Sequence, residues 1–525
     1  MINRDSRIWW GLMMSLFKTV ATVGGWTLVY RISSFIRDIL QARFLGAGMF
    51  ADVFAFAFKL ANIFRKIFSE GAFNASFLPI FSFVLKEKGE KEAQKFASQV
   101  FTLLVFLISF FMILLLIFCR EVLSVYCSGI DPNSIKFEHL VIISRICSTF
   151  IGASFLVALF GGILNTFNRF AMPAAVQVVL NLCVIAAFFV GPLWFPSVAY
   201  TMAWATFFAG IVQFLILWIN VRCCGMSVWF NFSSITDEVK SFFKKLISGA
   251  IGAGVWQLNI LIDFSILAKL PTGSASYFYY TDHVNQFPIG ILGIAFSTAL
   301  LPPLTNAIRS KDIVGAQKQM SIGLLFSFLF SLPAAVLLMS LCEPITMAIY
   351  GHGNFTATHV AAAAPALMAF AFGLPSYMMT KVFSTTFFAH KDTRTPFIGG
   401  IISIVSNLIF IMLFVPHMKH VGVALATSLS AWCNGLYLIC KLKSLNTVSI
   451  DRYTVVESFK QLFSSLMMLF VIYFSNPIAS PYYQKGGSEC AIALLLVVAA
   501  CVFVFFVVGK IIGIFKFLKD VKSVE

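Results

Sequence analysis

Charged residues are scarce in this sequence of 525 residues. They make up 11% of it, against about 25% in soluble globular domains. Hydrophobic residues make up 59%, and they form apolar runs of about 20 residues, the length of a membrane-spanning helix. The alternating pattern of transmembrane β-strands is absent. The sequence therefore predicts an all-α, polytopic membrane protein.

Catalytic motifs are missing as well. The sequence has no Gly-x-Ser-x-Gly elbow, no Walker loop and no His-Glu-x-x-His motif. The seven histidines show no metal-ligand spacing, and among the 11 cysteines only Cys119 and Cys127 are candidates for a disulfide. We therefore expect a transporter and not an enzyme, without a bound cofactor. Uphill transport would then depend on a sodium or proton gradient or on the membrane potential.

Fourteen apolar segments with short connections are expected to cross the membrane. They span residues 18–45, 50–85, 94–119, 139–166, 172–192, 197–221, 245–269, 275–308, 319–342, 358–389, 396–416, 420–440, 457–476 and 489–515. Of the 38 lysines and arginines, 25 fall on the side that holds the N-terminus, five on the other side and eight within segments. Because basic loops stay in the cytoplasm, both termini should be cytoplasmic. Topology and anionic lipids then explain the net charge of +16 without a nucleic-acid partner.

An internal repeat is visible, with a constant offset between its two copies. The residues Ala-Phe-x-x-x-Phe-Leu-Pro at 72–79 recur as Ala-Phe-x-x-x-Leu-Leu-Pro at 295–302, and Pro173 recurs at the same offset as Pro396. Six segments separate the copies, so both have the same orientation, as in parallel transporter repeats. We expect two six-helix bundles, residues 1–222 and 223–443, with a site between them. Two additional transmembrane helices and a cytoplasmic tail occupy residues 444–525.

The first two segments carry an unusual number of charges for membrane helices. Nine ionisable residues lie in this stretch: Arg31, Arg37, Asp38, Arg43, Asp52, Lys59, Arg65, Lys66 and Glu70. A charge at the bilayer centre costs roughly 2.5–3.5 kcal/mol, so these groups should face one another or a water-filled cavity. Six of the nine are basic, and guanidinium groups bind phosphate in a bidentate manner. Three or more arginines here therefore predict a diphosphate site, with purely structural ion pairs as the alternative.

Some of these charges should share helix faces. At 100° per residue, Asp52, Lys59, Lys66 and Glu70 fall within about 40° of one another. They can pair as acid and base along one face, lining or gating the cavity, or they can simply join helices. Arg31 and Asp38 share a face of the preceding helix, which Gly46 and Gly48 end.

The second half has fewer charges within its segments. Asp263 has no basic neighbour in the sequence, so it is a candidate ligand for sodium or a proton carrier, unless another helix supplies its partner. Asn407 and Thr427 could add neutral oxygens to such a cation site. Asp282 and His283 are adjacent, and a histidine near a cavity can change charge near physiological pH.

One further lysine stands inside an apolar segment. Lys381 lies close to Ser376 and Thr380, so cavity lining and a structural role are both open for it.

Several blocks of the sequence resemble the MurJ (MviN) family of lipid II flippases. The most specific are RISSFIRD at 31–38, FLGAG at 44–48, FKLANIFRK at 58–66 and EGAF at 70–73. Further matches are GGILNTFNRF at 161–170, YY at 279–280, FPIGILGIA at 287–295 and DTRTP at 392–396. The resemblance spans almost the whole chain, whereas the last two helices match only in hydropathy.

This resemblance implies the fold of the multidrug/oligosaccharidyl-lipid/polysaccharide exporter superfamily. It also implies transfer of lipid II, undecaprenyl-diphosphate disaccharide-pentapeptide, across the bacterial inner membrane by alternating access. The partners would then be the lipid-linked glycan, membrane lipids and the cell-wall synthesis machinery. The alternatives are a flippase for another polyprenyl-diphosphate glycan, an ion-coupled small-molecule antiporter, and a scaffold for cell-wall assembly that does not transport.

The resemblance also assigns roles to individual residues. Family arginines needed for function fall on Arg31, Arg37 and Arg65, with Asp52 as a further candidate. His283 stands where the family often has a fourth arginine, so a fixed positive charge is absent there. A sodium site of similar proteins would fall on Asp263, Asn407 and Thr427.

Overall fold

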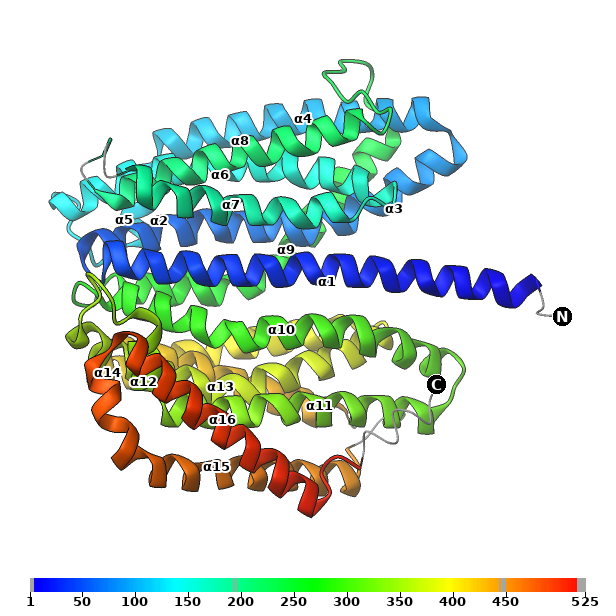
Figure 1. Cartoon of the computed structure of the whole chain (residues 1–525). Helices are drawn as coiled ribbons and strands as arrows, with labels where there is room; N and C mark the ends of the chain where they lie inside the picture. Colours follow the sequence, from blue (N-terminus) through cyan, green and yellow to red (C-terminus); the bar gives the residue numbers. More distant parts are fainter. Residues whose placement is uncertain (1–3, 192–193, 196, 443–444, 446–449, 517–525) are drawn as a thin grey trace. The chain divides into compact units, whose positions relative to one another are not determined.

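The computed structural model describes residues 4–191, 194–195, 197–442, 445 and 450–516. For residues 4–21, 69–71, 251–253, 255–256, 291–299 and 301 it describes the backbone alone. The described residues form helices and loops, without a β-strand (Figure 1). In chain order the helices are α1 (Arg4–Leu45), α2 (Met49–Arg65), η1 (Lys66–Ala72), α3 (Phe73–Glu87), α4 (Glu90–Ile117), α5 (Cys119–Tyr126), α6 (Ile135–Thr166), α7 (Ala171–Val190), α8 (Val198–Arg222), α9 (Asp237–Leu267), α10 (Ser274–Arg309), α11 (Ile313–Ser340), α12 (Cys342–Tyr350), α13 (Ala357–Ala389), α14 (Arg394–Leu442), α15 (Arg452–Lys485) and α16 (Gly487–Ile512).

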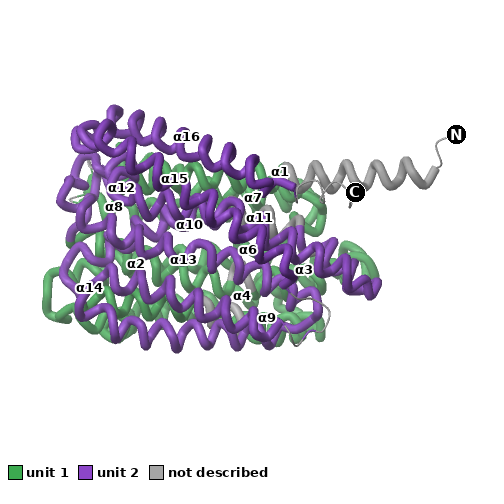
Figure 2. Tube along the Cα trace, turned by 90° about the horizontal axis from the view of Figure 1, so that it is seen from below, with its two compact units in different colours: residues 1–41, 49–269 green, residues 42–48, 270–525 purple. Residues whose placement is uncertain are grey.

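The chain forms two compact units (Figure 2). Unit 1 comprises residues 1–41 and 49–269, and unit 2 comprises residues 42–48 and 270–525. α9 belongs to unit 1 because it packs against η1 and α3. The sequence repeat predicts a boundary between its two copies at residue 222. The two units are defined by packing, so this boundary of the repeat stays a prediction.

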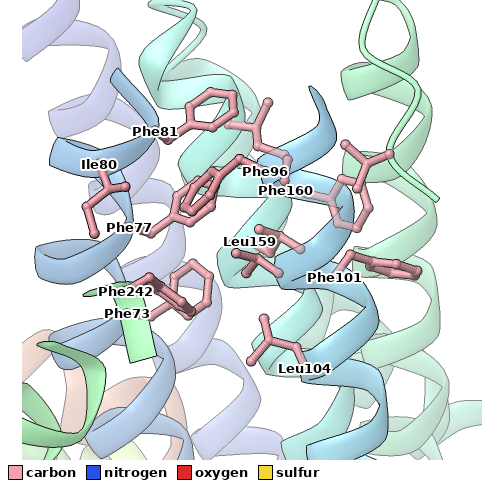
Figure 3. Packing of buried hydrophobic residues seen from close by; sticks show 14 of the residues in the cluster. Phe73, Phe77, Ile80, Phe81, Phe96, Phe101, Leu104, Leu159, Phe160 and Phe242 are labelled. Atoms are coloured by element: carbon pink, nitrogen blue, oxygen red, sulfur yellow. The ribbon is translucent and has the colours of Figure 1, made fainter. Parts of the chain in front are cut away.

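A column of phenylalanine rings forms much of the core of unit 1. Phe73, Phe77 and Phe81 recur every four residues along α3, so they lie on one helix face. Successive ring centroids are 5.3 and 5.1 Å apart. Phe242 of α9 packs edge-on against Phe73 and Phe77, and Phe96 of α4 stacks on Phe77 (Figure 3). Aromatic pairs of this kind add about 0.5–1.5 kcal/mol each beyond area burial, so they hold α3, α4 and α9 together.

α2 does not continue into α3 as a regular α-helix. Residues Lys66–Ala72 form a π-helical turn, whose hydrogen bonds run between residues five apart instead of four. The turn lies close to α9, since a Cβ on Gly249 would come within 3.2 Å of the Ala72 Cα. The helix register after Arg65 therefore differs from the register of α2.

In unit 2, α14 consists of two antiparallel arms. The chain reverses at Lys419, which has a φ of 50°, three residues after Pro416. The arms contact each other where the Ser403 hydroxyl donates to the Ser430 hydroxyl at 3.4 Å. These arms are the predicted segments 396–416 and 420–440.

Helices of the two halves begin at the constant offset that the sequence repeat predicts. α4 and α11 begin at Glu90 and Ile313, α5 and α12 at Cys119 and Cys342, and α7 and α14 at Ala171 and Arg394. The repeat seen in the sequence therefore corresponds to a repeated succession of helices.

Ten helices among the described residues are long and apolar enough to cross a membrane. They are the helix that runs through α2, η1 and α3, together with α4, α6, α7, α8, α11, α13, α14, α15 and α16. A multi-pass helical membrane protein is therefore confirmed, while the count of fourteen crossings stays a prediction.

The turn between α1 and α2 belongs to unit 2, where it is tightly packed. Gly46 has a φ of +68°, and a Cβ at this position would lie 2.6 Å from the backbone oxygen of Asn354. The Asn354 amide Nδ2 donates to the Phe44 carbonyl at 2.7 Å, and the Tyr280 hydroxyl donates to the Gly46 carbonyl at 3.0 Å. Only glycine combines this left-handed backbone with so close an approach.

All 11 cysteines are free. Cys119 and Cys127 are both buried thiols, so the disulfide considered from the sequence is not formed.

Candidate functional site

Arg37 lies at the centre of a buried polar network in unit 1. Its guanidinium donates to Asp38 Oδ1 from Nη2 at 2.7 Å and from Nε at 3.1 Å. From Nη1 it donates to Asn181 Oδ1 on α7 at 3.0 Å, and its Cζ lies 5.8 Å from the Phe58 ring centroid of α2. Arg37 and Asp38 are 5% and 2% exposed. The network therefore joins α1 to α7, and the Arg37 fork is engaged by protein acceptors.

Asn181 completes this network from the other side. Its Nδ2 donates to Ser33 Oγ at 2.9 Å and to the Tyr30 carbonyl at 3.2 Å. Asn181 was not predicted from the sequence, although an amide in the apolar segment 172–192 is a signal of a buried polar contact.

Arg65 lines a cavity of about 320 Å³ within unit 1. α1, α2, α3, α6, α7 and α8 contribute to the wall, whose polar members are Arg65, Asn74, Ser154, Asn165, Gln177 and Gln213. Arg65 Nε donates to Asn62 Oδ1 at 2.9 Å, which orients the guanidinium. The lining includes one cationic side chain and no acidic one. A guanidinium surrounded by amide groups can bind an anionic ligand that also carries hydroxyl or amide groups.

The amides of this cavity were not recognised in the sequence analysis. Asn74, Asn165 and Gln177 come from three different helices. Their convergence depends on how α3, α6 and α7 pack, which no local pattern reveals.

Asp52 pairs with Lys136, which lies between two of the expected membrane segments. Lys136 Nζ lies 3.1 Å from Asp52 Oδ2, and the Asp52 side chain is 2% exposed. This contact links the start of α2 to the start of α6.

The acid–base face expected along α2 stays a prediction, and the contacts around it are as follows. Lys59 Nζ lies 5.1 Å from the Phe264 ring centroid of α9, while Asp52 pairs with Lys136 on α6. Lys66 begins the π-helical turn and Glu70 lies within it, so the ideal spacing of 100° per residue does not extend to them. The side chain of Glu70 lies outside the described side chains.

Arg31 occupies a different environment from Arg37. It is partly buried, and its Nε has no hydrogen-bond partner among the described residues. Arg31, Arg37 and Arg65 all belong to unit 1, but Arg37 faces Asp38 and Asn181 whereas Arg65 faces the cavity. Their shared role in binding diphosphate remains a prediction.

The remaining candidates of the second half lie in unit 2. Asp282 Oδ2 accepts from Gln286 Nε2 at 2.7 Å within α10. The His283 ring is 4.3 Å from the Tyr279 ring, centroid to centroid, at an angle of 36°. Lys381 is exposed, although Ser376 and Thr380 beside it are buried.

The residues of the predicted sodium site come from both units. Asp263 is buried on α9 in unit 1, and Asn407 is buried on α14 in unit 2. Thr427 lies on the other arm of α14, where its hydroxyl donates to the Val423 carbonyl at 2.9 Å. The Ser403–Ser430 contact sets the register of the two arms, so Asn407 and Thr427 lie at similar heights. In the described part of the chain, no group of three or more His, Cys, Asp or Glu residues is placed to hold a metal.

Comparison with known sequences identifies the family of this chain. A family model described as lipid II flippase MurJ matches residues 41–494. A probable lipid II flippase MurJ from Rhizobium meliloti (strain 1021) is 34% identical over 440 residues, which is 82% of this chain and 81% of the relative. A probable lipid II flippase MurJ from Rickettsia prowazekii (strain Madrid E) is 34% identical over 424 residues, or 80% and 82% of the two chains.

The fold is also similar to that of solved structures. A lipid II flippase MurJ in an inward closed conformation superposes with a TM-score of 0.79 at 26% identity, covering 94% of this chain and 99% of the other. An inward-facing multidrug resistance transporter of the MATE family and MOP superfamily gives 0.62 at 14% identity, covering 80% and 95%. The second likeness supports the fold alone.

Proposed function

Because this chain belongs to the MurJ family of lipid II flippases, we propose that it moves lipid II from the cytoplasmic to the periplasmic leaflet of a bacterial inner membrane. The cargo carries a diphosphate between its polyprenyl chain and its sugars. A flippase must therefore give this doubly charged group a polar route through the bilayer. The protein acts by alternating access and performs no covalent chemistry on the cargo.

The observation that carries this proposal is the Arg65 cavity. Its lining combines one oriented guanidinium with several amides and no carboxylate. Guanidinium binds phosphate oxygens in a bidentate manner, and amide groups match the hydroxyl and N-acetyl groups of a sugar. We assign Arg65 as a diphosphate ligand, with Arg31, Arg37 and His283 as further contacts during the transport cycle.

The topology proposed for this function has fourteen transmembrane helices. Two parallel six-helix repeats are followed by the pair α15 and α16, with both termini in the cytoplasm. The constant offset between corresponding helix starts supports the repeats. The 25 basic residues on one side, against five on the other, support the orientation.

Two further features belong to the same proposal. Sodium or proton coupling would use Asp263, Asn407 and Thr427, whose side chains supply carboxylate, amide and hydroxyl oxygens. Cell-wall synthesis enzymes are proposed partners because they make and consume lipid II. Lys59, Lys66, Glu70, Asp282 and Lys381 are proposed to line or gate the route.

The rival functions differ in what Arg65 does. A small-molecule cation antiporter is disfavoured by a cavity lining that holds a guanidinium and no carboxylate, because like charges repel. A scaffold that does not transport would tolerate loss of this charge. A flippase for another polyprenyl-diphosphate glycan would require the same arginine.

The experiment is complementation in a bacterium depleted of its own lipid II flippase. We expect Arg65→Ala to abolish growth and Arg65→Lys to rescue poorly, since lysine offers a point charge and not a planar fork. Arg222→Ala is the matched control, because Arg222 is exposed at the end of α8 and stacks on Trp218, with its Cζ 4.3 Å from the ring centroid. Full growth with Arg65→Ala, at normal protein levels, would contradict the proposal.

A further inference from the structure

α15 carries a buried polar face within an otherwise apolar helix. Thr454, Glu457, Gln461 and Ser464 recur at the spacing of one helix face, and all four are buried. This face packs on α11, where the Gln461 amide Nε2 donates to the Leu325 carbonyl at 3.2 Å. A carboxylate and an amide therefore lie between two membrane helices, a costly arrangement unless they serve a function.

Several oxygens on this face have no hydrogen-bond partner among the described residues. They are Glu457 Oε2, Gln461 Oε1 and Ser464 Oγ on α15 and Ser321 Oγ on α11. Buried polar atoms almost always have partners, and each exception calls for an explanation such as a bound ion or water. Such exceptions on two contacting helices need an explanation, and Ser464 lies two turns from Glu457, apart from the other three.

The helix register places three of these oxygens, those of Glu457, Gln461 and Ser321, within one helical turn of the contact between Gln461 and Leu325. α11 and α15 run in the same direction, because Gln461 meets Leu325 and, further along both helices, residues 340–341 line the same cavity as residues 469–473. Ser321 lies one turn before Leu325, and Glu457 lies one turn before Gln461. Ser321 therefore faces α15 at the level of Glu457.

The chemistry of this cluster suits a small cation. Carboxylate, amide and hydroxyl oxygens are hard ligands, which hard cations prefer. Glu457 Oε1 accepts from Lys460 Nζ at 2.6 Å, and the Lys460 side chain is 35% exposed, so Lys460 reaches the carboxylate from the edge of the cluster. A single carboxylate beside a lysine suits one positive charge better than two.

We propose that Glu457, Gln461 and Ser321 form a binding site for a monovalent cation, with Na⁺ as the probe. The site lies entirely within unit 2 and shares no residue with the predicted site of Asp263, Asn407 and Thr427. Lys460 competes with the cation for Glu457. The outcome does not depend on the proposed function, because binding is measured without lipid II.

The test uses the purified full-length protein in detergent. Thermal unfolding is followed in NaCl and in choline chloride of equal ionic strength, and bound ²²Na⁺ is counted directly. Wild type should unfold at a higher temperature in NaCl, with a saturable dependence on concentration, because a ligand that binds only the folded state stabilises it. Glu457→Gln should weaken Na⁺ binding by about tenfold or more, since it removes the only carboxylate ligand.

Lys460→Met should change affinity in the opposite direction. Removing this like charge beside the Glu457 carboxylate should tighten Na⁺ binding by about fivefold or more, since the ammonium no longer repels the cation. Ser321→Ala removes one neutral ligand and leaves the charges intact, so it should weaken binding even if Glu457→Gln does not fold.

Two controls test whether Na⁺ binds at this cluster and not elsewhere on the protein. Glu489→Gln removes the acid of the exposed Lys485–Glu489 pair, whose atoms are 2.9 Å apart, and should leave Na⁺ binding unchanged. Asp263→Asn should also leave Na⁺ binding at the Glu457 cluster unchanged. The proposal is overturned if wild type shows no Na⁺-specific stabilisation, which would indicate a buried water only. It is equally overturned if Glu457→Gln and Ser321→Ala bind Na⁺ like wild type.

Discussion

The Arg37–Asp38 pair gives the sharpest prediction about stability. Both side chains are buried and are joined by two contacts to one carboxylate oxygen. Asp38→Leu would leave a buried guanidinium without its counter-charge, and breaking a buried pair in this way costs about 3–5 kcal/mol. Adding Arg37→Met removes the stranded charge, so the remaining cost should be the Asn181 Oδ1 acceptor that loses its donor, about 1–3 kcal/mol.

The double variant should therefore be about 2 kcal/mol more stable than Asp38→Leu alone. Reversible denaturant unfolding of the purified proteins in detergent measures the difference, with wild type and Arg37→Met completing the cycle. If the double variant is no more stable than Asp38→Leu, then the buried guanidinium is not what destabilises the single variant, and the reasoning is refuted.

Three further predictions follow from individual contacts. Gly46→Ala should lower the unfolding temperature, because a left-handed backbone costs an L-residue about 1–2 kcal/mol. The new Cβ would also lie 2.6 Å from a backbone oxygen. An unchanged unfolding temperature would contradict this geometry. Asp52→Leu should destabilise the protein more than Asp52→Leu combined with Lys136→Met, because the lone variant strands a partly buried ammonium; equal losses in thermal unfolding would argue against the pair. The hydrogen bond from Lys88 holds the pKa of Glu238 below its usual range. The stabilising effect of ionised Glu238 should therefore be present near neutral pH and fade as pH falls through the lowered pKa. Wild type and Glu238→Gln should then reach the same unfolding temperature in acid, and a difference in unfolding temperature that does not change with pH would rule the effect out.

Much of the helical architecture could be predicted from the sequence, because the hydropathy of a segment depends only on the residues within it. The expected segment 358–389 corresponds to α13 (Ala357–Ala389), and the reversal at Lys419 coincides with the expected break between two segments. The constant offset of the sequence repeat also appears in the helix starts. Each of these features depends on residues close together in the chain or on their order.

The polar contacts could not be predicted in the same way. Asp52 and Lys136 are 84 residues apart, and Arg37 and Asn181 are 144 apart, so their pairing depends on tertiary packing. The shared face of Asp52, Lys59, Lys66 and Glu70 stays a prediction, because a π-helical turn begins after Arg65 and the side chain of Glu70 lies outside the described ones. The cluster around Glu457 was missed because Glu457 and Gln461 lie in a helix that reads as a lipid-facing span, while Ser321 lies on α11, which only tertiary packing brings beside them.

The proposed activity of this chain is outward movement of a lipid-linked diphosphate glycan. The most direct measurement is the amount of lipid II that an impermeant enzyme can cleave from the periplasmic side, in cells that depend on this chain as their only flippase. On depletion of the protein, or on its replacement by Arg65→Ala, we expect total lipid II to rise while the cleavable fraction falls. A cleavable fraction that stays constant through depletion would contradict the account.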